Sequence, residues 1–161
     1  MLSSGKVGPG EYARSHPALT DAQTGLANRL HFELVYNYLF EAGGRGLPFT
    51  VLLVSTGAEG GLPDAEAREL GKAIEGTTRN SDLVSHVGSG RYVVLLLGTN
   101  LQGGRIAADR IDAAIGKVAP GTLAFGLAAY GEQCESADAL LRAADTALLA
   151  AEAAGGGVEF A

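Results

Sequence analysis

An arginine and an aspartate three positions apart, Arg79 and Asp82, lie shortly before a glycine-rich segment, Gly88-Ser89-Gly90. A guanidinium can bind a phosphate or the edge of a guanine base through two parallel hydrogen bonds, and a carboxylate can accept hydrogen bonds from base N–H groups. The pair could therefore bind a nucleotide. Arginine and aspartate at this spacing are also common as a solvated ion pair, so the pair alone does not distinguish a binding site from an ordinary surface.

The residues on both sides of the glycine-rich segment determine how the charged pair is presented. Leu83 to Val87 and Tyr92 to Leu97 are apolar runs rich in β-branched residues. Two such runs joined by a short turn of glycine and serine are typical of a β-hairpin. The sequence thus predicts a hairpin with the glycine-rich segment at its tip and the charged pair just before its first strand.

The composition restricts the classes of function. A chain of 161 residues with 47% hydrophobic residues suits one domain with a single sizeable core. The net charge of −6 argues against nucleic acid or an anionic membrane as a partner, because both require basic patches. The apolar runs are far shorter than the roughly 20 residues of a membrane-spanning helix, and the N-terminus does not resemble a signal peptide. The single cysteine, Cys134, excludes an internal disulfide and fits a cytoplasmic location.

The pattern along the chain predicts one α/β domain over residues 17–161, preceded at 1–16 by a linker or a cloning remnant. Helices are expected at 27–42, 64–77, 101–118 and 137–154, and further strands at 49–54, 122–128 and 158–160. Asp64 is expected as the N-cap of its helix. Together with the hairpin, this order predicts helices packed on a mainly antiparallel central sheet.

The first predicted helix carries more apolar residues than one buried face requires. One face has Leu30, Leu34, Val35, Tyr38 and Leu39, and a second stripe beside it has Phe32, Tyr36 and Phe40. So wide an apolar arc suggests contact with a second partner in addition to the core, whereas an ordinary buried helix is the simpler explanation.

Four segments follow one family pattern, in order and at matching spacing. Asp21 to Arg29 reads as Asp-x-Leu-Thr-Gly-Leu-x-Asn-Arg except at Gln23, and Ala144 to Glu152 reads as Ala-Asp-x-Ala-Leu-Tyr-x-Ala-Lys except at the Tyr and Lys positions. Ala124 to Ala128 corresponds to a strand ending Ser-Ile-Gly-Val-Ala, and Gly88-Ser89-Gly90-Arg91-Tyr92 stands in place of Gly-Gly-Asp-Glu-Phe. The chain therefore resembles the GGDEF family, the diguanylate cyclases, with an altered signature. The resemblance implies a palm-like nucleotidyl cyclase fold.

The same resemblance predicts a loss of catalysis. Members that make cyclic di-GMP hold two Mg²⁺ ions between an aspartate at the end of the first strand and the acidic residues of the hairpin. In this chain Ser55 stands at the strand-end position, Arg91 at the glutamate position, and Glu152 in place of a late lysine that reaches the triphosphate. A guanidinium repels a dication, and two unit charges ~4 Å apart near a protein surface interact by roughly 4 kcal/mol. We expect no catalytic residues, no metal site, no cofactor and no conversion of GTP.

A product-binding site of the family has counterparts in this chain. Many members carry an inhibitory Arg-x-x-Asp site at a fixed distance before the hairpin motif, with a second arginine in the following helix. Arg79 and Asp82 lie at that distance from Gly88, and Arg110 falls at the position of the second arginine. The resemblance implies that Arg79, Asp82 and Arg110 bind cyclic di-GMP. A solvated ion pair and an ordinary exposed arginine are the alternative.

The sequence leaves three functions open. The first is a cyclic di-GMP receptor in bacterial second-messenger signalling, which passes the signal to an attached sensor or effector domain or to a protein partner. The second is an interaction or dimerisation module without nucleotide binding, formed by the stripe of Phe32, Tyr36 and Phe40. The third is an allosteric GTP binder, in which the amides of Gly88 to Gly90 approach phosphate and Arg91 replaces the metal charge.

Overall fold

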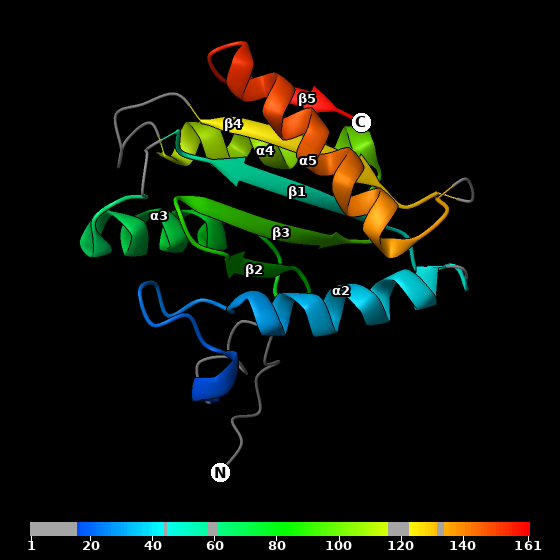
Figure 1. Ribbon diagram of the computed structural model, residues 1–161, viewed down its shortest axis with the longest axis horizontal. Coiled ribbons are helices and arrows are strands. Elements are labelled where there is room, and N and C mark those ends of the chain that lie inside the picture. Colours follow the sequence, from blue (N-terminus) through cyan, green and yellow to red (C-terminus); the bar gives the residue numbers. More distant parts are fainter. Residues whose placement is uncertain (1–15, 44, 58–60, 116–122, 132–133) are drawn as a thin grey trace.

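A five-stranded sheet with the order β2-β3-β1-β4-β5 lies at the centre of the protein (Figure 1). The structure is a computed structural model and describes residues 16–43, 45–57, 61–115, 123–131 and 134–161. The strands are β1 (Phe49–Ser55), β2 (Leu83–His86), β3 (Arg91–Leu97), β4 (Ala124–Ala129) and β5 (Gly157–Phe160). Neighbouring strands are antiparallel except β4 and β5, which are parallel. The prediction of a mainly antiparallel sheet is confirmed.

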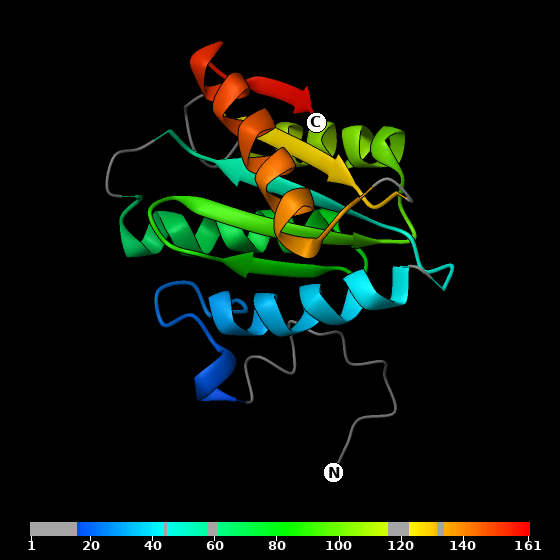
Figure 2. The same ribbon diagram turned by 45° about the vertical axis from the view of Figure 1, so that its right-hand side comes forward.

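Helices cover both faces of this sheet (Figure 2). α2 (Arg29–Gly43) and α5 (Ala137–Ala153) pack on one face, and α3 (Asp64–Thr77) and α4 (Leu101–Ile115) pack on the other. A short 3-10 helix, η1 (Pro17–Leu19), precedes α2. Within the described ranges, no helix has both the length and the apolar character needed to cross a bilayer.

Strand β1 is buried over its whole length because each of its faces packs against a pair of helices. Val51 and Leu53 belong to the core under α2 and α5, whereas Leu52 and Val54 belong to the core under α3 and α4. A strand that is buried on both faces reads as a continuous apolar run, which is the pattern of residues 49–54. The central strand therefore separates two cores, and the end of this strand places Ser55 beside the hairpin.

Most predicted elements agree with the structure, and two details need comment. The predicted linker at 1–16 lies almost entirely outside the described residues and stays a prediction, as do residues 116–118 of the third helix and residue 122 of its following strand. The prediction that Asp64 caps α3 is wrong. Pro63 occupies the N-cap, and Asp64 is the first helical residue. There its carboxylate, together with that of Glu66, stabilises the helix N-terminus through the helix dipole.

The packing of α2 corrects the interpretation of its two apolar stripes. Phe32 and Tyr36 are each only 3% exposed, so most of the stripe that was considered as a partner surface lies in the core. The Phe32 ring stacks on the Tyr36 ring at 5.4 Å, and Tyr36 packs edge-on against Phe49 of β1 at 6.0 Å. Leu34 and Tyr38, from the other stripe, are 57% and 72% exposed. The hypothesis of an interaction surface through the aromatic stripe is therefore wrong.

The close approach of α5 to β4 depends on Gly126. A Cβ atom added at this glycine would lie 2.4 Å from the Leu148 amide nitrogen and 2.5 Å from the Ala144 carbonyl oxygen, both in the backbone of α5. We expect Gly126→Ala to lower the free energy of unfolding by about 2 kcal/mol or more, because backbone atoms cannot move aside as a flexible side chain can. Urea unfolding will measure the change.

Gly76 in α3 is the matched control. A Cβ atom there would meet nothing within 4 Å, and the residue has ordinary helical geometry. Gly76→Ala should raise the free energy of unfolding by roughly 0.5–1 kcal/mol, since alanine loses less backbone entropy in a helix. If Gly126→Ala is as stable as Gly76→Ala, the described packing of α5 is contradicted.

Candidate functional site

The tip of the predicted hairpin is a tight turn in left-handed backbone. Gly88, Ser89 and Gly90 have φ angles of 95°, 51° and 71°. The Arg91 amide donates to the Gly88 carbonyl at 3.0 Å, and the Gly90 carbonyl accepts from the Thr56 amide at 3.1 Å. A Cβ atom at Gly90 would lie 2.4 Å from the Thr56 hydroxyl. The backbone at position 90 therefore favours glycine over any residue that could supply an acidic side chain.

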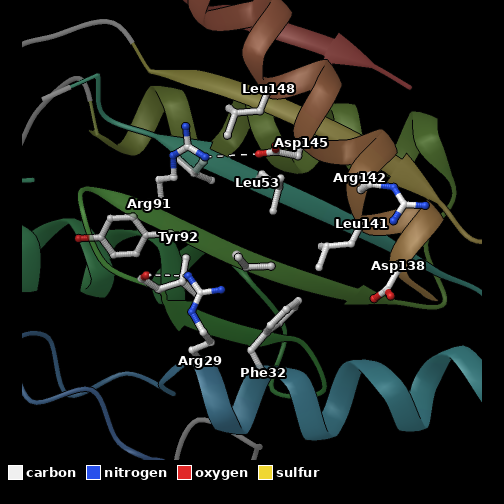
Figure 3. A pocket seen from close by; sticks show the side chains of 13 residues that line it. Arg29, Phe32, Leu53, Arg91, Tyr92, Asp138, Leu141, Arg142, Asp145 and Leu148 are labelled. Atoms are coloured by element: carbon white, nitrogen blue, oxygen red, sulfur yellow. Dashed lines mark hydrogen bonds and ion pairs between the residues drawn. The ribbon is translucent and has the colours of Figure 1, made fainter. Parts of the chain in front are cut away.

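The side chain of Arg91 crosses from the start of β3 to α5 and forms the centre of a charged group. Its Nη1 lies 3.3 Å from Asp145 Oδ1, and its Nη2 lies 3.3 Å from Glu152 Oε1 (Figure 3 shows the contact with Asp145). The second oxygen of Glu152 accepts from the Ser55 hydroxyl at 3.1 Å. Ser55 is directly opposite Arg91 in the β1–β3 pairing. We call Ser55, Arg91, Asp145 and Glu152 the Arg91 cluster.

The Arg91 cluster is partly exposed, which limits its contribution to stability. The side chains of Arg91, Asp145 and Glu152 are 39%, 48% and 29% exposed. Ion pairs in this range contribute about 0.5–1 kcal/mol each, since water and salt screen them. The cluster matters more for cation binding than for stability. The Arg91 guanidinium is paired with the two carboxylates that would otherwise attract a cation.

Tyr92, the aromatic residue after Arg91, anchors the hairpin to α3. Its ring is fully buried, and its hydroxyl donates to the Ala67 carbonyl at 2.7 Å. Burial raises the pKa of Tyr92 far above its usual range, with a smaller contribution from the negative charge of Asp21. The phenol therefore stays protonated and serves as a hydrogen-bond donor.

Arg79 and Asp82 form a compact turn in which the carboxylate is a structural acceptor. Asp82 Oδ2 accepts from the Arg79 amide at 3.0 Å and lies 3.5 Å from Arg79 Nε, and Oδ1 accepts from the Leu97 amide at 3.1 Å. The Asp82 side chain is 3% exposed, whereas the Arg79 side chain is 61% exposed. The Arg79 guanidinium also donates to the Leu97 carbonyl and, at 2.9 Å, to the Thr99 hydroxyl. These contacts fix the direction of an exposed guanidinium.

The structure brings the three predicted ligand-binding residues around one shallow cavity. Arg79, Asp82 and Arg110 line a space of about 280 Å³ between the end of α3 and α4. The hydroxyl-bearing residues Thr78 and Thr99 line it as well. Both oxygens of Asp82 already accept main-chain hydrogen bonds, whereas Arg79 and Arg110 are exposed.

A buried contact between Asp21 and His86 has no counterpart among the sequence predictions. His86 Nδ1 lies 3.0 Å from Asp21 Oδ2, and the imidazole is only 2% exposed. Asp21 also accepts from the amide and hydroxyl of Thr24, and the His86 amide donates to the Ala27 carbonyl at 3.0 Å. These contacts tie the turn that precedes α2 to strand β2. The signal in the sequence was a carboxylate and an imidazole separated by 65 residues, a distance at which pairing is not apparent.

Comparison with known proteins defines the class. The family model described as "Diguanylate cyclase, GGDEF domain" matches residues 63–157, which is more than half of the chain. The protein therefore belongs to the GGDEF family. No curated protein matches it at a significant level.

Solved structures show the same fold. The GGDEF domain of TpbB (YfiN) from Pseudomonas aeruginosa is 26% identical, with a TM-score of 0.74 over 88% of this chain and 94% of that one. The coiled coil and GGDEF domain of DgcB from Caulobacter crescentus, in complex with cyclic di-GMP, is 18% identical, with a TM-score of 0.78 over 94% of this chain and 88% of that one. Diguanylate cyclase SiaD from P. aeruginosa, in complex with its activator SiaC, is 21% identical, with a TM-score of 0.79 over 93% of this chain and 64% of that one.

The residues at the family's metal positions do not fit Mg²⁺. This ion requires several hard oxygen ligands in octahedral geometry. The positions offer the hydroxyl of Ser55, a glycine at 90 and the guanidinium of Arg91, whose charge is directed at the two carboxylates of α5. Among the described residues, no three His, Cys, Asp or Glu side chains are grouped so that they could hold a metal ion.

Reversing the charge at Arg91 tests whether the ion pairs of the Arg91 cluster stabilise the fold. Arg91→Glu removes two ion pairs and places a third carboxylate beside Asp145 and Glu152. We expect a loss of roughly 1–2 kcal/mol in the free energy of unfolding. Adding Glu152→Lys should re-form one pair with reversed charges, so that the double variant is more stable than the sum of the single effects by about 0.5–1 kcal/mol. Urea unfolding of the four proteins measures this coupling.

An exposed pair on α4 serves as the control. Arg105 and Asp109 lie 3.7 Å apart with side chains that are 51% and 65% exposed. The same charge reversal there should give a coupling below about 0.5 kcal/mol. Strictly additive effects at positions 91 and 152 would show that the cluster does not hold β3 to α5.

Proposed function

We propose that the protein is a catalytically inactive, degenerate GGDEF domain that acts as a cyclic di-GMP receptor or regulatory module. The observation that carries this proposal is the convergence of Arg79, Asp82 and Arg110 on one cavity beside the hairpin. The family contains cyclases, and solved relatives such as DgcB were determined in complex with cyclic di-GMP. The ligand class is therefore shared with proteins of the same fold.

The contacts of the Arg79 turn suggest how the ligand would be bound. Arg79 is exposed, yet its side chain is already oriented by Asp82, Leu97 and Thr99, so little rotamer freedom is lost on binding. A guanidinium in this state suits the O6 and N7 atoms of guanine or a phosphate, and Arg110 adds a second cation across the cavity. We assign Asp82 the role of positioning Arg79, because its oxygens are engaged with the backbone.

The Arg91 cluster supports the absence of catalysis. A cyclase must hold metal ions that activate a ribose hydroxyl and neutralise the triphosphate. Here Arg91 would repel such ions and Glu152 would repel the phosphates, and the left-handed backbone at Gly90 disfavours an acidic replacement. We propose that the domain converts no GTP with Mg²⁺ or Mn²⁺.

The same contacts bear on the two other candidate functions, an allosteric GTP site and an interaction module. An allosteric GTP site at the tip is disfavoured, because the Arg91 guanidinium, which would have to replace the metal charge, is already paired with Asp145 and Glu152. An interaction module remains a second candidate, now through a different surface. Leu30, Leu34 and Tyr38 on α2 are exposed by 49%, 57% and 72%. The ordered Arg79 turn supports a nucleotide receptor more strongly than these exposed residues support an interaction module.

The domain would act through a neighbour. We propose a cytoplasmic location and a connection to a sensor domain, an effector domain or a protein partner, as in the SiaD–SiaC complex among its structural relatives. A change in affinity for such a neighbour is the output that this proposal requires.

Titration calorimetry with cyclic di-GMP tests the receptor. Arg79→Ala should weaken binding at least about tenfold, since a charge-assisted hydrogen bond to the ligand is lost. Arg110→Ala should weaken it in the same direction. Arg105→Ala, an exposed arginine of the same helix that does not line the cavity, is the matched control and should bind as the wild type does. No binding of the wild type at tens of micromolar, or no effect of Arg79→Ala, would refute the receptor.

A further inference from the structure

Helices α2 and α5 meet at one end and diverge toward the other. The Tyr36 hydroxyl of α2 donates to the Ala137 carbonyl at the start of α5. From this contact the axes separate toward the N-terminus of α2, as both ribbon views show (Figures 1 and 2). The resulting wedge contains a cavity of about 360 Å³ above β1 and β3. It lies on the opposite face of the sheet from the Arg79 cavity, which α3 and α4 line.

The wall of the wedge cavity is largely apolar. Its apolar lining includes side chains from both helices and both strands, among them Phe32, Leu53, Val93, Leu141 and Leu148. Figure 3 shows Phe32 and Leu141 facing each other from the two helices, with Leu53 above them in this view. Cavities of roughly 300–1,000 Å³ with apolar walls and a few polar groups are the usual form of small-molecule sites.

The arginines of the wedge cavity differ in their partners. Arg91 is paired with both Asp145 and Glu152. Arg29 donates to the Val87 carbonyl at 3.2 Å, which orients its side chain and leaves further N–H groups without a carboxylate among the described residues. Arg142 and Asp138 line the opposite end of the cavity from Arg29, so the Asp138 carboxylate lies away from the Arg29 guanidinium (Figure 3).

We propose that the wedge cavity binds a small amphipathic anion, a carboxylate attached to an apolar body of roughly eight carbons. The Arg29 guanidinium donates charge-assisted hydrogen bonds to the carboxylate oxygens. The apolar body lies between Phe32 and Leu141, on Leu53 and Val93. Such a ligand bridges the diverging helices and stabilises one angle between α2 and α5. This proposal is independent of cyclic di-GMP binding, because the two cavities share no residue.

Octanoate is the probe, with octanamide as its neutral counterpart, and binding is followed by calorimetry and by amide chemical shifts of residues around the cavity. Wild type should bind octanoate at least about fivefold more tightly than octanamide, because only the carboxylate pairs with Arg29. Arg29→Gln should remove this preference, and Arg29→Lys should retain part of it because the charge is kept.

Three further variants separate the site from general effects. Arg45→Gln changes an exposed arginine that does not line the cavity and should bind as the wild type does. Leu141→Trp fills the cavity and should abolish octanoate binding while circular dichroism confirms the fold. Arg79→Ala should leave octanoate binding unchanged, which distinguishes this site from the receptor cavity.

The proposal is overturned if octanoate does not bind below about 10 mM, a limit reached by even very weak sites. It is also overturned if octanamide binds equally well, or if Leu141→Trp folds and still binds.

Discussion

The ion pairing of Arg91 with Asp145 and Glu152 is the constraint on which the rest of the site depends. It joins the start of β3 to α5 and, through the Ser55 hydroxyl, to the end of β1. These are the elements that converge at the metal position of the family. A guanidinium held between two carboxylates joins these elements by ion pairs, and the proposed loss of metal binding rests on this arrangement. The carboxylate of Glu152 supplies Arg91 with one of its two partners.

The remaining polar contacts lie on opposite faces of the sheet. On the α3–α4 face, Asp82 uses its carboxylate to close a turn and orient Arg79. On the α2–α5 face, Arg29 and the apolar wedge form a second cavity, and the Asp21–His86 contact ties the turn before α2 to β2. The sheet lies between them, and its central strand β1 is buried over its whole length. The two proposed ligand sites therefore lie on opposite faces of the sheet.

The strands, the hairpin and the helix order could be predicted from the sequence because each depends on local pattern and turn residues. The buried face of α2 could not be predicted. The helix has two apolar stripes, one with Phe32 and Tyr36 and one with Leu34 and Tyr38, and helical periodicity does not show which of them is buried. The Arg79–Asp82 pair was recognised by spacing, but the burial of Asp82 depends on Leu97, which lies 15 residues away. The partners of Arg91 lie 54 and 61 residues away, so only the fold reveals them.

Failure to turn over GTP could have several causes, whereas metal affinity tests the electrostatic constraint itself. Manganese binds oxygen sites of this kind and broadens the amide signals of nearby residues. The direct measurement is a titration of the ¹⁵N-labelled protein with Mn²⁺ in the presence of GTP, followed at Ser55, Thr56 and the hairpin tip. The Arg91 cluster predicts that these signals broaden no more than those of exposed residues elsewhere. Selective, saturable broadening at Ser55 and Gly88 to Arg91 would show that a metal site persists and would contradict this account.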